Sequence, residues 1–463
     1  MIITPKLTLN NKDSLNKLHD ATLDILQNTG ISVEVESAAD IFLQAGAKVV
    51  KEKRGWRVHI GTTMVEEALK TLPGKVNLYG RIPKHDVCLG EKPVYTFFGE
   101  GIRIIDINSR KIRPSTKADC GQTALFCDYF DNLQIMERSV ASGDAPAQTH
   151  PLHNAQAIFK NTSKHACIGA FTGKNVDKMV EMAKCCLEDG NFRNRPFLSF
   201  SACPTSPLTL GRSCCETILH GAPHGAPIVI ISMALSGASA PLSPAATVVQ
   251  HNAEVLSASV LTQLVNPGNC CVYGSCSCPI NLKTGSINLS SPEAFFINQC
   301  LTELAAKYQM PSWIGVGLSV KPKPEQQSCY EYGTYASLAT MGGADIILGT
   351  AGLDSGMAFD YAKAVMDIEV NRMLGYMKQG MDISDEAVAK EVIDQAGPGA
   401  NFLINPHTLA NLSKIFNAEP VFSKANTDTI ELAYDKAKQV LENHQPAALP
   451  KGAEDRMTKI IEN

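Results

Sequence analysis

The chain has 463 residues, of which 19% are charged, and its 42 basic and 46 acidic side chains give a formal net charge of −4. This length allows about three domains or one large barrel with additions, and it can bury an ample core without metal or disulfide staples. The slightly acidic balance excludes binding of nucleic acid or of an anionic membrane through bulk charge. The charged fraction is below the usual ~25%, which favours a homo-oligomer whose subunits cover part of the surface.

The sequence gives no sign of export or of a membrane anchor. Residues 1–11 lack a basic start followed by an apolar core, and the longest apolar stretch, 226–235, is far shorter than the ~20 residues of a membrane helix. The 15 cysteines are odd in number, and many lie in apolar runs. We therefore expect a cytoplasmic protein with reduced, buried thiols, no structural disulfide and no intrinsic zinc, because Cys270-Cys271 and Cys276-Ser277-Cys278 strain tetrahedral ligation.

The first 93 residues predict an N-terminal extension of helices and short strands. An amphipathic helix over 15–28 is closed by Gly30, and two more helices are expected over 38–43 and 62–72. A short, turn-rich strand follows around 76–79. We expect this extension to pack on the domain that follows.

Residues 94–379 alternate short apolar runs with longer helical stretches. The spacing from one run to the next, from the second run onward, is about 30–44 residues, which fits one strand, one helix and two loops. Eight such units predict an α/β protein with a (β/α)8 TIM barrel; an open doubly wound sheet is the alternative. The expected strands are 95–98, 133–138, 165–171, 197–203, 227–233, 271–274, 312–317 and 345–349.

The intervening helices have clear start signals. Ser115-Thr116 precedes a helix over 117–130, Asn175 precedes one over 176–187, and Ser291-Pro292-Glu293 opens one over 294–308. Residues 380–463 predict a mostly helical C-terminal extension that packs on the barrel. The catalytic site of such a barrel lies at the carboxyl ends of its strands.

Common catalytic motifs are missing from the sequence. There is no phosphate loop, no GxGxxG after a strand, no HExxH and no paired CxxC, and no expected strand end carries a cluster of Asp, Glu and His. Acid–base chemistry would depend on Glu100, Lys321, Glu325 or His407. The strand ends are instead small, polar and glycine-rich, with aromatic residues among them: Tyr95, Phe97, Phe98, Tyr273, Tyr330, Tyr332, Phe359 and Tyr361.

Aromatic rings can enclose a quaternary ammonium, because their negative faces attract a desolvated cation, although rings at strand ends are often ordinary core. Composition alone does not separate these alternatives.

Several segments together resemble the trimethylamine:corrinoid methyltransferase superfamily over roughly residues 10–440. They include Tyr273-Gly274-Ser275, the stretch 313–331 with Lys321-Pro322-Lys323-Pro324-Glu325-Gln326-Gln327, the stretch 342–347 with Asp354-Ser355-Gly356, and 397–408, which reads GPGANFLINPHT. The founding members of this superfamily carry pyrrolysine and act on trimethylamine. Every position here is a standard amino acid, so the resemblance points to the branch lacking pyrrolysine, whose members demethylate quaternary amines such as glycine betaine, proline betaine, carnitine or γ-butyrobetaine.

The resemblance implies that the methyl group passes to the Co(I) of a separate corrinoid protein, with no cofactor bound by this chain itself. The enzyme would hold the cation, align one N–CH3 bond with cobalt and exclude water. We expect Tyr95, Phe97, Phe98, Tyr273, Ser275, Tyr330, Phe359 and Arg103 to bind the substrate and Lys321, Gln326, Gln327, Glu100 and His407 to position it. A substrate carboxylate would meet Arg103, Lys321, Lys323 or His407.

Three alternatives stay open: trimethylamine as the substrate, a catalytically silent amine-binding member of the fold, and a zinc-dependent methyltransferase barrel.

Overall fold

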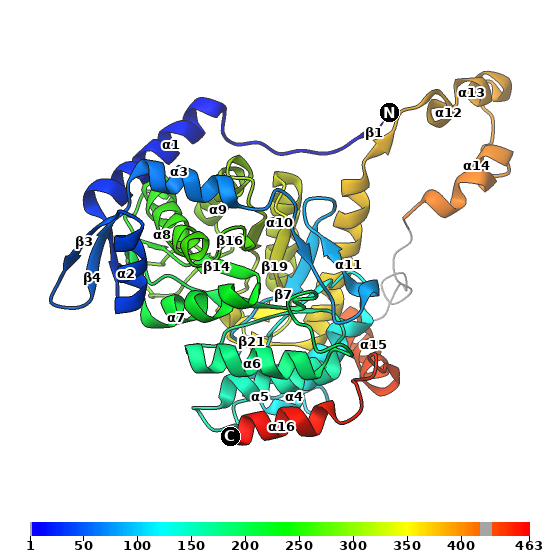
Figure 1. Cartoon of the computed structure of the whole chain (residues 1–463). Helices are drawn as coiled ribbons and strands as arrows, with labels where there is room; N and C mark the ends of the chain where they lie inside the picture. The colour runs from blue at the N-terminus through cyan, green and yellow to red at the C-terminus, as the bar shows by residue number, and fades with distance from the viewer. Residues whose placement is uncertain (1, 417–427) are drawn as a thin grey trace.

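The structure, a computed structural model, describes residues 2–416 and 428–463. Its centre is a ring of eight parallel strands surrounded by helices (Figure 1). The predicted (β/α)8 barrel is therefore confirmed, and all eight expected strands are present. In spatial order they are β10 (Ile135–Glu137), β11 (His165–Ile168), β12 (Leu198–Ala202), β14 (Ile228–Ser232), β16 (Cys271–Ser275), β18 (Ser312–Gly315), β19 (Ile346–Thr350) and β7 (Val94–Phe97).

The ring is joined by side chains at one seam, between β7 and β10. The Thr96 hydroxyl donates to the Ile135 carbonyl at 3.0 Å and accepts from the Glu137 N–H at 3.1 Å. Beyond the strands, Gly101 forms a parallel bridge with Val140. The seam thus lies beside the carboxyl end of β10.

Eight helices form the outer layer of the barrel, and each begins near the carboxyl ends of the strands. Side-chain caps start most of them, as Thr116, Thr172, Ser243, Ser291 and Asp360 do. The helices are α4 (Lys117–Tyr129), α5 (His150–Asn161), α6 (Gly173–Cys185), α7 (Arg212–Gly221), α8 (Pro244–Val265), α9 (Pro292–Lys307), α10 (Gln326–Gly342) and α11 (Tyr361–Gln379).

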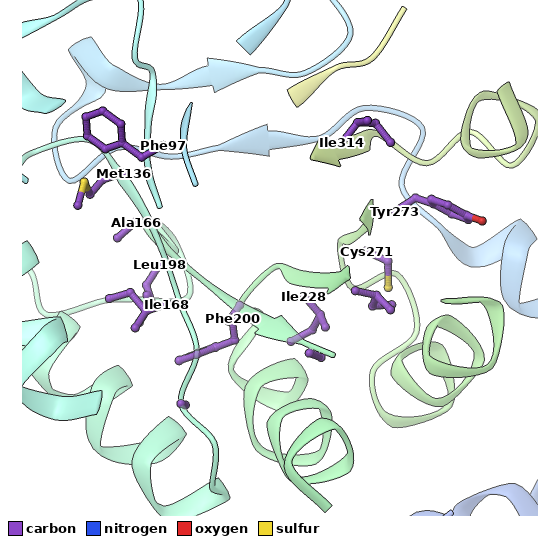
Figure 2. Packing of buried hydrophobic residues seen from close by; sticks show 14 of the residues in the cluster. Phe97, Met136, Ala166, Ile168, Leu198, Phe200, Ile228, Cys271, Tyr273 and Ile314 are labelled. Carbon is purple, nitrogen blue, oxygen red and sulfur yellow. The ribbon is translucent and has the colours of Figure 1, made fainter. Parts of the chain in front are cut away.

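The strands separate two apolar layers. The outer layer lies between strands and helices, and Figure 2 shows part of it, including Met136, Ile168 and Phe200. The inner layer fills the barrel and includes Ile135, Cys167 and residues of the other strands. Consecutive residues of a strand therefore alternate between the two layers.

The three helices of the N-terminal segment pack on α8, on the outside of the barrel, whereas its residues Val76, Leu78 and Leu89 join the inner layer. The segment consists of helices and a small sheet in which β2 pairs with β13 from the barrel region. Its elements are β1 (Ile2–Ile3), α1 (Lys12–Asp24), the π-helix η1 (Ile25–Thr29), β2 (Ile31–Val33), α2 (Glu36–Gln44), β3 (Lys48–Lys51), β4 (Trp56–His59), α3 (Thr62–Thr71), β5 (Asn77–Leu78), the 3-10 helix η2 (Pro83–His85) and β6 (Val87–Cys88).

Short strands and 3-10 helices lie in the loops of the barrel, and further helices follow the barrel along the chain. These short elements are β8 (Arg103–Ile105), β9 (Ile112–Pro114), β13 (Thr209–Leu210), η3 (Ala222–His224), β15 (Leu235–Ser236), β17 (Cys278–Pro279), β20 (Gly352–Leu353), η4 (Asp354–Gly356) and β21 (Ala358–Phe359). After α11 come β22 (Met381–Asp382), α12 (Asp385–Val388), α13 (Lys390–Ala396), α14 (Pro406–Asn411), η5 (Leu412–Lys414), α15 (Thr429–Asn443) and α16 (Ala453–Glu462).

The last two helices lie on the barrel, whereas α12, α13 and α14 extend away from it (Figure 1). Helix α15 packs on α11 and α4, and α16 packs on α5 and α6. Within residues 2–416 and 428–463, no helix combines the length and apolar character needed to cross a bilayer.

Candidate active site

The carboxyl end of β10 buries a carboxyl group inside the barrel. Ile135 belongs to the inner layer and Met136 to the outer layer, so the alternation of the strand turns Glu137 inward. Glu137 is 5% exposed, and its Oε2 atom has no hydrogen-bond partner among residues 2–416 and 428–463. A Cβ atom on Gly99 would lie 2.7 Å from Glu137 Oε1, so glycine at position 99 leaves room for the carboxyl group.

The surroundings of Glu137 favour its neutral form in the empty site. Burial is the main cause that raises the pKa of Glu137 to about 8; the charge of Glu100 adds to the rise, while a hydrogen bond with Cys167 and the charge of Arg138 oppose it. A cation beside the carboxyl group would favour the carboxylate instead. Glu137 can therefore become charged when a positively charged ligand arrives.

A buried arginine follows directly along the chain. Arg138 is 3% exposed, and its Nη2 atom lies 2.5 Å from Glu100 Oε2. The Glu100 side chain is 58% exposed, so this ion pair connects a buried cation to the rim of the barrel. Arg138 Nη1 has no hydrogen-bond partner in the described part of the chain, which leaves this atom free to donate to another acceptor.

Solvent reaches the inner side of β12 and β14 and of the residues that follow them. Along 231–235, Ile231, Met233 and Leu235 are partly exposed while the two residues between them are buried. On β12, Ser201 is partly exposed, and Cys203 just beyond it is exposed. These partly exposed side chains mark where solvent enters the carboxyl end of the barrel, a region called the hollow below.

Two phenylalanines lie at this end of the barrel. Phe171, which follows β11, is 47% exposed, and its ring and the Ser201 hydroxyl both lie beside Gly169. Phe98, which follows β7, is partly buried against the inner layer, and its ring lies so close to Gly356 that no Cβ would fit there. Aromatic faces in these positions can attract an organic cation.

The thiols near Glu137 are not activated. Burial raises the pKa of Cys167, Cys203 and Cys276, so these thiols stay protonated at neutral pH. All the cysteines of the chain have free thiols. Among the described residues, no group of three or more His, Cys, Asp or Glu side chains is arranged to hold a metal ion.

Four of the aromatic residues predicted to bind substrate lie in the outer core, which corrects that prediction. Tyr95 hydrogen-bonds Thr340 of α10, and Tyr273 donates to Asn252 of α8, so both rings point toward helices. Phe97 and Phe359 contact each other edge to face at 5.2 Å in the same outer layer. These side chains point outward from the barrel, on the side of their strands that faces the helices.

Ser275 shares this orientation, because its hydroxyl donates to Asn298 of α9 at 2.6 Å. It is fully buried and lies away from the hollow.

In the loop after β18 and the first turns of α10, polar side chains contact each other at short sequence separation. Lys321 pairs with Glu325 at 3.1 Å, and Gln327 donates to Glu331 at 2.7 Å. Gln326, the first residue of α10, is exposed, and Tyr330 is 62% exposed. The Tyr330 ring is therefore open to solvent in this structure, and its contact with the substrate stays a prediction.

Two further candidates lie at opposite ends of the molecule. Arg103 forms an ion pair with Asp354 among the loops that follow β7 and β19, close to the open end of the barrel. His407 lies on α14, in the segment that extends away from the barrel. Of the residues predicted from the sequence, Phe98 and Glu100 lie around the hollow, and His407 does not.

Sequence interpretation missed Glu137, Arg138 and Phe171. For Glu137 and Arg138 the sequence does contain a usable pattern. The two charged residues end the apolar run at 133–138, where a barrel strand reaches its catalytic end.

Comparison with known proteins gives the same fold and a specific family. The solved structure of the monomethylamine methyltransferase MtmB of Methanosarcina barkeri matches with a TM-score of 0.56 at 13% identity, covering 94% of this chain and 88% of that chain. This likeness concerns the fold.

Two curated relatives come from Desulfitobacterium hafniense. The trimethylamine methyltransferase MttB of strain DSM 10664 / DCB-2 is 35% identical over 97% of this chain and 92% of the relative. A glycine betaine methyltransferase of strain Y51 is 28% identical over 99% of this chain and 97% of the relative. The model of the trimethylamine methyltransferase (MTTB) family matches residues 2–463. The chain thus belongs to the trimethylamine methyltransferase (MTTB) family and is a methyltransferase.

Proposed function

We propose that the enzyme transfers a methyl group from a quaternary amine that carries a carboxylate, such as glycine betaine, proline betaine or carnitine, to the Co(I) of a corrinoid held by a partner protein. The observation that carries this proposal is Glu137, a buried carboxyl group with an unpartnered oxygen beside a solvent-accessible hollow. Once ionised, a carboxyl group in this place can act as the counter-ion of an organic cation that has lost its water shell on binding.

A quaternary nitrogen suits a site without an activated acid or nucleophile. The nitrogen is already positively charged, so its leaving group is a neutral tertiary amine that keeps the electron pair of the broken N–CH3 bond. The reaction needs no proton on the leaving group and no electrophilic imine, and pyrrolysine is absent from the sequence. The corrinoid would supply the nucleophile, so this chain must bind, orient and desolvate the amine.

The residues divide these tasks between the two ends of the substrate. Glu137 faces the ammonium as a carboxylate, and the rings of Phe98 and Phe171 lie where they can cover its methyl groups. Arg138 follows Glu137 and so turns toward the other face of the strand; at the rim, beside Glu100, its unpartnered Nη1 atom is the donor that we assign to the substrate carboxylate. An arginine held in place by Glu100 fits a carboxylate better than the exposed lysines of the loop after β18 do.

The carboxyl end of the barrel is also the end at which a large partner could approach. Glu100, Phe171 and Cys203 are exposed there. A corrinoid presented by its carrier could therefore face the hollow without movement of the helices.

Trimethylamine is the second candidate substrate, because the relative named trimethylamine methyltransferase is 35% identical and the betaine relative 28%. Trimethylamine has no carboxylate for Arg138 and no permanent charge for Glu137. The two candidates therefore predict different amine preferences.

A screen of amines with Co(I) cobalamin tests the proposal. The panel contains the betaines, carnitine, choline as a quaternary amine without a carboxylate, and trimethylamine, and loss of the Co(I) absorbance reports methyl transfer. We expect a carboxylated quaternary amine to react fastest and choline to react more slowly. Equal activity on trimethylamine and every betaine would contradict the proposal, and no activity with any amine would favour a silent amine-binding protein.

A further inference from the structure

The loop after β19 contains the motif Asp354-Ser355-Gly356, to which the proposed function gives no role. All three residues have positive φ angles, of 52°, 55° and 90°. Residues other than glycine rarely adopt this backbone conformation, and the strain persists only where the surrounding structure holds it. Strain of this kind at the open end of the barrel points to a positioning role.

Backbone hydrogen bonds join the motif to the loop after β18. The Asp354 N–H donates to the Lys321 carbonyl at 2.8 Å, and the Ser355 N–H donates to the Ser319 carbonyl at 2.7 Å. Two consecutive residues of the motif are therefore held by the backbone of a neighbouring loop, which fixes their unusual conformation.

A second set of contacts joins the motif to the loop after β7. The Met357 carbonyl, directly after the motif, accepts from the N–H groups of Ile102 and Arg103, both at 3.1 Å. The guanidinium of Arg103 also forms an ion pair with the Asp354 carboxylate. The motif thus lies between two loops of the catalytic end, and one of them begins with Phe98.

The ring of Phe98 lies directly on the backbone of Gly356. A Cβ atom on Gly356 would lie 2.3 Å from Cε1 and 2.7 Å from Cδ1 of this ring, so no side chain fits between them. Phe98 is partly exposed, although it also contacts the inner layer of the barrel. A ring that is supported from behind in this way can be displaced only toward the hollow.

We propose that the 354–356 motif positions the Phe98 ring and that Gly356 thereby sets the width of the cation site. This inference rests on the proposed function, in which Phe98 covers the methyl groups of the ammonium. A ring that rests on a fixed backbone cannot retreat before a larger head group, so the site is organised for one size of cation before binding. A side chain at position 356 would push the ring forward and narrow the site.

Binding of tetramethylammonium tests the proposal without turnover, because this ion has the methyl groups of a betaine but no carboxylate. We expect Gly356→Ala and Phe98→Ala each to raise its Kd by about tenfold in a calorimetric titration. The double variant should bind as Phe98→Ala alone does, because the alanine at 356 then has no ring to displace. Additive losses, or a native Kd in Gly356→Ala, would overturn the proposal.

Gly343→Ala is the matched control for backbone strain. Gly343 ends α10 with a φ of 87°, and beyond its own helix a Cβ there would meet no described atom within 4 Å. This variant should lower the melting temperature and leave the Kd unchanged. The same pattern in Gly356→Ala would assign Gly356 a purely structural role and overturn the proposal.

The native protein decides the matter even if Gly356→Ala does not fold. Tetraethylammonium, which has a wider head group, should bind at least about tenfold more weakly than tetramethylammonium. Equal binding of the two ions, or no binding of tetramethylammonium, would overturn this inference. Methyl transfer from a betaine in the amine screen would still support the proposed function, so the two can fail separately.

Discussion

Charged groups are buried at the carboxyl ends of both β10 and β19, but only those at β19 have hydrogen-bond partners for the atoms compared here. At β19, the ammonium of Lys363 donates to both oxygens of Asp367, and Asp367 also accepts from the Ala351 N–H at 2.8 Å. At β10, no described residue forms a hydrogen bond with Glu137 Oε2 or Arg138 Nη1.

This difference separates a structural network from a binding site. The Lys363–Asp367 pair is extended by Tyr332, whose ring lies 4.8 Å from Lys363 Nζ and whose hydroxyl donates to Asn371. A complete network of this kind fixes the start of α11 against the barrel. An incomplete one costs free energy in the empty protein, so it persists where a ligand completes it.

Breaking the complete network should produce the largest effect on stability. Asp367→Asn leaves Lys363 buried and without its counter-ion, which costs about 3–5 kcal/mol of unfolding free energy. Denaturant unfolding followed by circular dichroism measures this loss. A loss below about 1 kcal/mol would show that the Lys363–Asp367 pair does not stabilise the fold, and would contradict its interpretation as a structural network.

The matching substitution in the incomplete site should affect the rate and not the stability. Removing the counter-ion of a buried cation costs at least about 2–3 kcal/mol, so Glu137→Gln should lower kcat/KM by about 100-fold, since each factor of ten is about 1.4 kcal/mol. Its unfolding free energy at pH 7 should stay close to that of the native protein. The Co(I) absorbance assay and a denaturant titration on the same sample give both numbers, and a large stability loss with an intact rate would make Glu137 a structural residue.

The same carboxyl group should make substrate binding depend on pH. Because the pKa of Glu137 in the empty site is raised to about 8, binding of a quaternary cation below pH 8 must release its proton. The affinity should therefore increase with pH by up to tenfold per unit below about pH 8 and level off above it. Calorimetric titration across this range measures the trend, and Glu137→Gln, which cannot ionise, should give a flat profile.

The smallest effect is expected from Tyr330. Its ring is 62% exposed, and an exposed cation–π contact is worth only about 0.5–1 kcal/mol. Tyr330→Ala should lower kcat/KM by a factor of five at most and leave the melting temperature unchanged. A 30-fold loss would mean that α10 moves to cover the substrate during turnover.

The fold was predictable because strands and helices alternate at a regular spacing in the sequence. The 30–44-residue spacing and the caps at Thr116 and Ser291 predict strands and helices within a few residues of those observed. The domain boundaries near residues 93 and 379 remain a prediction, although β7 starts at Val94 and α11 ends at Gln379.

The site was harder to predict, because the side-chain direction at a strand end depends on a single residue of register. Tyr95 and Phe98 are both aromatic and lie on one strand end, yet Tyr95 faces α10 and Phe98 faces the inner layer. The strand prediction gave no register, so all the rings were candidates. The Glu-Arg pair at 137–138 was passed over for the same reason, since its direction relative to the barrel was unknown.

The order in which the barrel can form follows from the position of β7. In the described structure, the backbone ladder of β7 runs along β19 alone, although β7 comes first among the barrel strands and β19 last. During synthesis, the first strand must therefore wait for nearly the whole barrel before it gains its backbone partner, and such distant pairings form slowly. Until then, β7 is held beside β10 by side chains, the Thr96 hydroxyl on the Ile135 carbonyl and the Gln134 side chain on the Tyr95 N–H. Any chain that ends before Ile346 therefore keeps an open barrel with an exposed edge.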